Sequence, residues 1–469
     1  MGKSIQTSEG AGSQGNQSKS VDHPPACRRP AGRKPGPTPQ VEAFGGLLPA
    51  LIDHCFPKLN DWFDGLPDPR RQDMCVYLSR HIWWQMVLTC LLRHGSRNGF
   101  DGDRNTGLLP KNLVQLCRHV WDEERLGPRR TVTCSENAKH HASRVAVSAV
   151  AGIPIKMLRR LIQMRLLDTG RLFDHWWLIA IDGTLQDRGH DTKKGEARHR
   201  YVLAASLVGP FGLSFPLMSE FMDMRDPVRD KEDCELKAFQ RLSKRLRTEF
   251  PRLPICLLLD GLYPVQSVFD TCDAYGWKFI ATLREGRQPT AYDEAVQTLL
   301  MSTSLVSHGQ RNGENGPVNQ TLRWTNDVPF GAHAFPVLFS GEISPTRATL
   351  WVWVTNLRLT HERVYAIANH GGRARNNIEN LFNVEKNGGF GLEHTFCANT
   401  QASQNYHLMM QVAFILWQLL AKGLLQRLTH ACRKVSDLKL VELLRTSLLT
   451  VLITPDLPTF GQLRFRSSA

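Results

Sequence analysis

The segment Trp177–Thr184, with the sequence WLIAIDGT, is an apolar run of strand length that ends in an Asp-Gly pair. A second run of the same kind, PICLLLDG, covers Pro254–Gly261. Continuous apolar runs of this length are typical of central strands that are buried on both faces of a sheet. Asp182 and Asp260 would then lie where the sheet opens to solvent, the usual place for sites in open α/β sheets. Asp-Gly is also a common turn dipeptide, so a turn-forming role for either aspartate stays open.

The segments around these runs predict the order three strands, helix, strand, helix, strand. The amphipathic helix Lys231–Phe250 separates the third strand from the fourth, and a helix that starts with Pro264 precedes the fifth. The strands are expected at Trp177–Asp182, Arg200–Val208, Leu213–Phe221, a run ending at Asp260, and Lys278–Leu283.

A charged helix is predicted further along the chain. Arg375, Glu379, Phe382 and Lys386 follow one another in steps of 4, 3 and 4, which places them on one face of a helix. One acid between two cations suits a site that holds a divalent metal and also binds phosphate oxygens. A solvated helix with an Arg–Glu pair explains the same pattern, but the two aspartates favour the site.

The three acids together predict a metal site. Carboxylate oxygens without His or Cys suit magnesium or manganese better than zinc. Three acids from distant parts of a chain can hold two such ions. Ions roughly 3.5–4 Å apart stabilise both the attacking and the leaving oxygen of a phosphoryl displacement. The residues therefore indicate metal-dependent phosphodiester chemistry.

The order Asp182, Asp260, Glu379 resembles that of the DDE transposases of bacterial insertion sequences. Arg375 stands four residues before the glutamate and Lys386 seven after it. This spacing is most similar to the family-four type, whose signature is Tyr-x2-Arg-x3-Glu-x6-Lys.

The resemblance runs from about Trp177 to Leu420 and departs from the signature at one position. The motifs Asp182-Gly183-Thr184 and Asp260-Gly261-Leu262-Tyr263 are also similar to the first and second acid motifs of the family. Gly372 stands where the signature has Tyr. The departure puts in doubt the contact that such a Tyr makes near the transposon end, but not the metal triad.

The resemblance implies an α/β fold: an RNase H-like catalytic domain with a β-rich insertion and a helical N-terminal domain. It also implies that Asp182 bridges two Mg²⁺ ions, for which Mn²⁺ can substitute, while Asp260 and Glu379 each complete one coordination shell. Arg375 and Lys386 would bind the phosphates that flank the scissile bond, the Arg in a bidentate fork and the Lys as a point charge.

The implied activity is cut-and-paste DNA transposition. Water attacks first and frees a 3′-hydroxyl at the end of the element, and that hydroxyl then attacks target DNA. The implied partners are double-stranded DNA, as terminal inverted repeats and as target, and a second copy of the chain when two ends are paired. The expected location is the bacterial cytoplasm, at the nucleoid. Two alternatives stay open: a catalytically silent DNA-binding protein derived from a transposase, and a metal-dependent nuclease without strand transfer.

Four regions are predicted: a disordered basic tail at 1–43, a helical N-terminal domain at 44–170, a catalytic domain at 171–430, and a C-terminal helical segment at 431–469. The resemblance implies that the N-terminal domain binds DNA ends. The β-rich insertion is placed at about 287–363. Its expected strands are Thr321–Trp324, Ala334–Phe339 and Ala348–Thr355. Trp324, Trp351 and Trp353 in these strands either stack on DNA bases or belong to the sheet core.

Composition agrees with a nucleic-acid partner. The 469-residue chain has a net charge of +14 and a pI near 9.4, which favours a polyanion. The 11 cysteines include no Cys-x2-Cys pair, so reduced thiols explain them better than disulfides or a zinc site. The N-terminus lacks the apolar stretch of a secretory signal. The apolar segment Leu408–Leu428 includes Gln and Lys residues, which predicts a buried helix and no membrane span.

Two further segments have two interpretations each. Ser143–Val150 and Ile155–Leu167 form either a helix-turn-helix, with Lys156, Arg159 and Arg160 directed at DNA, or an ordinary helical hairpin. The basic stretch Arg28–Gly36 is either a minor-groove arm or a solvated tail.

Several charged residues are held in reserve as site candidates. Glu385 is expected to be a surface charge. Glu393 and His394 are placed on the loop after the charged helix, where they could approach the site. Asp223, Asp226 and Glu235 are expected to be solvated or capping charges.

Overall fold

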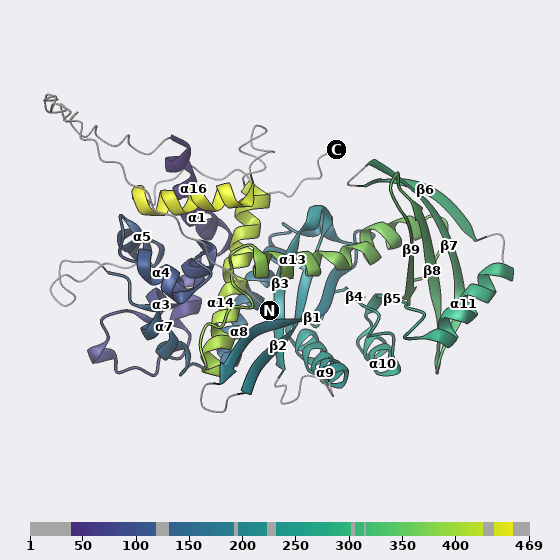
Figure 1. The fold of residues 1–469 in the computed structure, drawn as a ribbon, viewed down its shortest axis with the longest axis horizontal. Coiled ribbons are helices and arrows are strands. Elements are labelled where there is room, and N and C mark those ends of the chain that lie inside the picture. Colours follow the sequence, from purple (N-terminus) through teal and green to yellow (C-terminus); the bar gives the residue numbers. More distant parts are fainter. Residues whose placement is uncertain are drawn as a thin grey trace, which may run out of the picture. The chain divides into compact units, whose positions relative to one another are not determined.

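The computed structural model describes residues 39–118, 131–191, 196–222, 231–301, 305–313, 316–424 and 436–453. Among these residues the chain is α/β, with nine strands in one mixed sheet (Figure 1). The strands are β1 (Trp177–Asp191), β2 (Glu196–Val208), β3 (Ser214–Met222), β4 (Ile255–Leu259), β5 (Lys278–Thr282), β6 (Val306–Gly313), β7 (Gly316–Phe330), β8 (His333–Ile343) and β9 (Ala348–Thr355). Their order across the sheet is β3-β2-β1-β4-β5-β9-β8-β7-β6.

The centre of the sheet is parallel. Strand β4 pairs in parallel with both β1 and β5, whereas β2 and β3 add antiparallel pairs beyond β1. Ile179, Ala180 and Ile181 of β1 are fully buried, and so is every residue of β4. The prediction that both apolar runs are central strands is confirmed, because their side chains are covered on both faces.

Strand β1 is longer than predicted. It was expected to end at Asp182, but it continues to Asp191 because its second half forms a hairpin ladder with β2, from Asp182 opposite Ala204 to Asp191 opposite Glu196. The extension is polar, so no apolar run marks it. Strand-strand hydrogen bonds hold it instead.

The β-rich region extends the central sheet. Strand β9 pairs antiparallel with β5, and β8, β7 and β6 follow in turn. The three strands predicted for this region lie within β7, β8 and β9. Strand β6 was not predicted, because Val306 is the one apolar or β-branched residue in its sequence VSHGQRNG.

Helices cover the sheet and form most of the N-terminal part. They are α1 (Pro39–Cys55), α2 (Leu59–Asp64), α3 (Ser79–Leu91), α4 (Arg97–Asp103), α5 (Leu109–Leu116), α7 (Ser135–Ala142), α8 (Val147–Gln163), α9 (Lys231–Glu249), α10 (Gln266–Tyr275), α11 (Pro289–Met301), α12 (Val364–Ala366), α13 (Asn376–Asn387), α14 (Thr400–Gln418) and α16 (Asp437–Thr450). Helix α9 packs against β2 and β3, whereas α13 contacts β1, β2 and β3. In the view of Figure 1, α13 crosses above these strands and α9 lies below them.

The prediction of two helices separated by Ala151–Pro154 is wrong. Helix α8 is continuous from Val147 to Gln163 and includes Pro154. A proline inside a helix removes one backbone hydrogen bond, but burial of Pro154 with its apolar neighbours compensates for that loss. Arg159, which the helix-turn-helix interpretation directs at DNA, donates at 2.8 Å to both the carbonyl and the carboxylate of Glu249 on α9.

Helix α14 confirms the prediction of a buried helix in the apolar C-terminal segment. Nearly all of its residues are buried, and it packs against α3, α8 and β3. Among the described helices, none combines the length and the apolar character that crossing a membrane requires. The basic stretch Arg28–Gly36, Asp223 and Asp226 lie outside the described residues.

Glu385 on α13 is buried, so the expectation of a surface charge is wrong. Its side chain is 0% exposed, and Gln411 of α14 donates to its Oε1 at 3.0 Å. Burial raises the pKa of this carboxyl from 4.5 to about 8, while the bond from Gln411 and the charges of Arg93 and Lys386 oppose the rise. Near neutral pH the folded protein therefore keeps Glu385 protonated.

This burial predicts a pH-dependent stability. In the unfolded chain Glu385 loses its proton near pH 4.5, whereas the folded chain holds it to about pH 8. Its contribution is fully present below pH 4.5 and is lost as pH rises towards 8, by about 1.4 kcal/mol per pH unit. Glu385→Gln, which cannot ionise, should become increasingly more stable than the wild type across this interval. Denaturant unfolding between pH 5 and pH 8.5 measures the difference.

The matched control is Glu294→Gln, at an exposed position on α11. Its stability should follow the wild type at every pH. Parallel curves for Glu385→Gln and the wild type would contradict the buried, protonated state of Glu385.

Candidate active site

Asp182 and Asp260 lie level with each other at neighbouring parallel strands. In the β1–β4 ladder, Ala180 is the partner of Leu258, so each aspartate stands two residues past this pair. Strand β4 ends at Leu259, whereas β1 continues alongside β2. The two carboxylates therefore flank the point at which β1 and β4 separate. The structure brings together the two aspartates that the sequence singled out.

Each aspartate is held by the backbone that follows it. Asp182 Oδ1 accepts a hydrogen bond from the backbone N–H of Gly183 at 3.0 Å. Asp260 Oδ1 accepts one from the N–H of Leu262 at 2.8 Å. In each case Oδ2 is not used by this bond. An aspartate that receives a backbone N–H two residues on is a common turn motif, so the turn interpretation of Asp260 and a site role are compatible.

Helix α13 brings Glu379 to the aspartates, and Arg375 stands directly before its first residue. Arg375 Nη1 lies 3.4 Å from Asp182 Oδ2, and the same guanidinium forms an ion pair with Glu379. The Glu379 side chain is 46% exposed, whereas that of Asp182 is 19% exposed. Asn377 anchors the start of the helix, because its amide donates at 2.9 Å to the carbonyl of Gly209 at the end of β2.

Four carboxylates act on one another at this place. Burial raises the pKa of Asp182 from 3.8 to about 7, Arg375 lowers it, and the charges of Asp260, Glu235 and Glu379 raise it further. Such mutual opposition to ionisation is the electrostatic condition under which a bound cation is most favourable. The excess negative charge is only partly neutralised by Arg375.

The donor set fits a hard divalent cation. Asp182, Asp260 and Glu379 offer carboxylate oxygens alone, which suit Mg²⁺ or Mn²⁺. In the described part of the chain, no three His, Cys, Asp or Glu side chains are gathered closely enough to share one ion, and Arg375 occupies the space between Asp182 and Glu379 as their counter-charge. Of the residues that could hold a metal, Asp182 and Glu379 are thus paired with Arg375, and Asp260 lies level with Asp182 at the neighbouring strand.

Lys386 lies elsewhere on α13. Its ammonium is 3.0 Å from Glu393 Oε1, and Arg188 of β1 lies 3.7 Å from Glu393 Oε2. Glu393 therefore forms ion pairs with both Lys386 and Arg188. Lys386 is paired there and not with Asp182, Asp260 or Glu379. His394, its neighbour, donates its backbone N–H to the carbonyl of Gly391 at 2.9 Å.

Gly372 is packed against an indole. A Cβ at this position would lie 2.5 Å from Trp353 Cε2 and 2.6 Å from Trp353 Nε1. No side chain fits there without displacement of the ring. Gly372 stands where the signature has Tyr. The Trp353 ring fills the space that a side chain at this position would need.

The three tryptophans of the β-rich region have different surroundings. Trp324 and Trp353 are buried in the sheet core, whereas Trp351 is 38% exposed. Trp351 stacks on Trp353 with 6.1 Å between ring centroids and an interplanar angle of 6°. The guanidinium of Arg373 lies 5.0 Å from the Trp351 ring and also forms an ion pair with Glu342. Of the three, only Trp351 offers a ring to a partner.

Sequence reasoning missed Glu235 and Arg284 near the aspartates. Glu235 is 7% exposed, so the expectation of a solvated or capping charge is wrong. Its position four residues before Phe239 on the apolar side of α9 was a usable signal, because this spacing places it on the buried face. Arg284 lies against Gly261, where an added Cβ would be 2.8 Å from its Cδ. No pattern marked Arg284, which stands just after β5.

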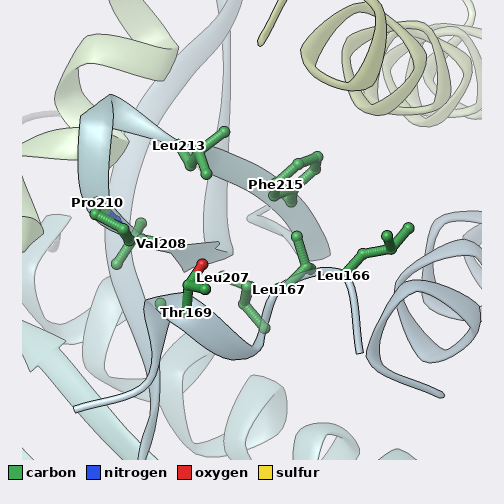
Figure 2. A pocket seen from close by; sticks show the side chains of 10 residues that line it. Leu166, Leu167, Thr169, Leu207, Val208, Pro210, Leu213 and Phe215 are labelled. Carbon is green, nitrogen blue, oxygen red and sulfur yellow. The ribbon is translucent and has the colours of Figure 1, made fainter. Parts of the chain in front are cut away.

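A separate pocket lies at the C-terminal end of β2, beside the turn that leads to β3. Figure 2 shows Leu207, Val208, Pro210, Leu213 and Phe215 around it. Leu166, Leu167 and Thr169 complete much of its lining. Thr169 is the one polar side chain among the labelled residues, and no charged side chain lines the pocket. A pocket of this composition suits an apolar group and not a phosphate.

Comparison with protein-family models found no family that matches the chain, and comparison with curated proteins found no match. The functional conclusion therefore depends on the residues and the geometry described above.

The packing of Gly372 predicts a specific loss of stability. Gly372→Ala should destabilise the fold by about 1–3 kcal/mol, because the new methyl group overlaps the Trp353 ring. The loss should be smaller in a Trp353→Phe background, where the ring is smaller. Denaturant unfolding of the four proteins in this cycle measures the coupling.

Gly152→Ala is the matched control, since nothing lies within 4 Å of a Cβ at that position of α8. This variant should be unchanged or more stable, by up to about 1 kcal/mol, because Ala favours a helix more than Gly does. Equal effects of the two substitutions would contradict the close packing at Gly372.

Proposed function

We propose that this protein is a transposase of the DDE type, which cuts DNA at transposon ends and joins them to target DNA in a metal-dependent reaction. The observation that carries the proposal is the ion pairing of Arg375 with both Glu379 and Asp182, which lies level with Asp260. These residues come from two neighbouring parallel strands and one helix far along the chain. A surface Arg–Glu pair on a solvated helix would not approach a buried aspartate.

The fold class that goes with this proposal is RNase H-like. The sub-order β3-β2-β1-β4-β5, in which β2 runs antiparallel to β1 and β3 while β4 and β5 are parallel to β1, supports it. Strands β6–β9, inserted between Asp260 and Glu379, agree with the expected β-rich insertion. The first acid then lies on the first strand and the second at the end of the fourth.

Each site residue has a proposed role. Asp182, Asp260 and Glu379 would hold two Mg²⁺ ions, or Mn²⁺ in their place; when bound, such ions activate the nucleophile and stabilise the charge of the displacement. Arg375 would bind a phosphate through its planar fork. In the structure the carboxylates of Asp182 and Glu379 take the place of the phosphate oxygens. Lys386, one end of the Lys386–Glu393 pair, would bind a phosphate further along the strand.

The proposed partner is double-stranded DNA. The net charge of +14 favours it, since cationic side chains release the counterions of phosphates. Trp351, partly exposed beside Arg373, offers a stacking surface for a base, which refines the expectation held for three tryptophans. Transposition requires two paired ends, so a homodimer on DNA belongs to the proposal, as does a place in the bacterial cytoplasm.

The decisive experiment incubates purified protein with labelled DNA that carries the native flanking ends, a target plasmid, and Mg²⁺ or Mn²⁺. We expect end cleavage and joining by the wild type. Asp182→Asn should abolish both steps and leave end binding nearly unchanged, because it removes a carboxylate charge with little change in shape. Gel analysis of products and of bound complexes measures all three properties.

The control is Asp293→Asn, at an exposed position on α11, which should act as the wild type does. Cleavage without joined products would support the nuclease alternative. Binding without cleavage by the wild type would support a silent DNA-binding protein, a possibility raised by Gly372 at the position of the signature Tyr. Unchanged cleavage by Asp182→Asn would contradict the proposed role of Asp182.

Arg375→Lys tests the phosphate role of the fork. The substitution keeps the positive charge but loses the bidentate geometry, which contributes roughly 1.5–3 kcal/mol in charge-assisted bonds. We therefore expect cleavage to slow roughly 10- to 100-fold, with end binding within a few-fold of the wild type. Single-turnover cleavage rates measure it. An unchanged rate would indicate that Arg375 serves only as a counter-charge for Asp182 and Glu379.

A further inference from the structure

Glu235 is inserted between the two segments that carry the aspartates. It lies near the start of α9, on the face that packs against β2 and β3. A Cβ at Gly183 would lie 3.1 Å from both Cδ and Oε2 of Glu235 and 3.2 Å from Oε1. The carboxylate therefore rests directly on the backbone that follows Asp182, and the glycine leaves room for it.

Tyr263 ties the same carboxylate to the other aspartate segment. Its hydroxyl donates to Glu235 Oε1 at 2.9 Å, and the ring is fully buried. The Tyr263 backbone N–H in turn donates to the carbonyl of Asp260 at 3.3 Å. Phe239, one turn after Glu235 on α9, packs on the Tyr263 ring with 5.4 Å between centroids. Helix α9 thus contacts the Asp260 segment through one hydrogen bond and one aromatic contact.

Glu235 also brings a negative charge close to the two aspartates. The charge of Glu235 raises the pKa of Asp182, together with the charges of Asp260 and Glu379. A glutamine would accept the Tyr263 hydrogen bond with the same shape and without the charge. The charge is useful when a cation is bound nearby, because it then adds to the attraction.

We propose that Glu235 is a positioning residue, which holds the Asp182 and Asp260 segments at the spacing that binds a divalent cation and adds its negative charge to that site. The inference rests on the proposed function, since it concerns the same site. It assigns to α9 a role beyond packing. Tyr263 is its partner in this role, and Gly183 is the position that lets the carboxylate approach.

The test measures Mn²⁺ binding to the full chain without DNA, by isothermal titration calorimetry. Glu235→Gln should weaken Mn²⁺ binding roughly 10- to 100-fold, the usual range for residues that support metal ligands. Its thermal stability without metal should stay close to that of the wild type, because glutamine keeps the shape and accepts the Tyr263 hydrogen bond. Tyr263→Phe, which keeps the ring and the charge but loses the hydrogen bond, should weaken binding in the same direction by a smaller factor.

A role in packing alone predicts a different result. In that case Glu235→Gln would bind Mn²⁺ as tightly as the wild type, and this outcome overturns the proposal. In cleavage assays, the proposal predicts that Glu235→Gln needs a higher Mn²⁺ concentration for half-maximal rate while its affinity for DNA ends stays the same. Glu235→Asp, which restores the charge, should recover part of the Mn²⁺ affinity, and no recovery above Glu235→Gln counts against the proposal.

Two control variants distinguish a failure of this inference from a failure of the proposed function. Asp293→Asn should bind Mn²⁺ as the wild type does, and Asp182→Asn should lose binding. A wild type that binds Mn²⁺ at Asp182 but cuts no DNA removes the transposase proposal and leaves the role of Glu235 supported by the titrations. Equal Mn²⁺ affinity of wild type and Asp182→Asn shows that no cation site is present there and overturns the inference.

Discussion

The parallel pairing of β1 with β4 is the constraint on which the rest of the site depends. It aligns Trp177 with Ile255 and Ala180 with Leu258, so the two Asp-Gly pairs emerge at the same level. A shift of this register by one residue would turn the side chains of one strand to the opposite face and separate the carboxylates. The alignment is supported from both sides, because β1 also pairs with β2 and β4 also pairs with β5.

Helix α13 is held beside the aspartates by contacts at its start and in its last turn. Asn377 holds its start to the end of β2, and Gln411 meets the buried Glu385 in its last turn. The segment before the helix is joined to the inserted strands by the ion pair of Arg373 with Glu342 and by the fit of Gly372 to Trp353. The position of Arg375 thus depends on strands that are distant in the chain.

The site contains more acidic than basic side chains. Arg375 neutralises part of the negative charge, and Glu235 increases it from a buried position. In a folded protein such an arrangement is unfavourable unless a cation or a positively charged partner is present. This imbalance is the physical basis of the metal-dependent chemistry that we propose and of the part that we assign to α9.

The sequence alone determined the local features: two buried strand segments that lead into Asp-Gly pairs, the helix that carries Glu379 and Lys386, the amphipathic helix α9, and the three strands within β7, β8 and β9. These features depend on periodicity and apolar runs, which neighbouring residues specify. The sequence pattern predicted a break in α8 at Pro154, but burial compensates for the hydrogen bond that this proline removes. The pattern also did not reveal the polar extension of β1 or strand β6, because pairing with neighbouring strands holds both. The tertiary structure decided which charges meet. It placed Glu385 and Glu235 in the interior and Lys386 beside Glu393, because burial and ion pairing arise from segments that only the fold brings together.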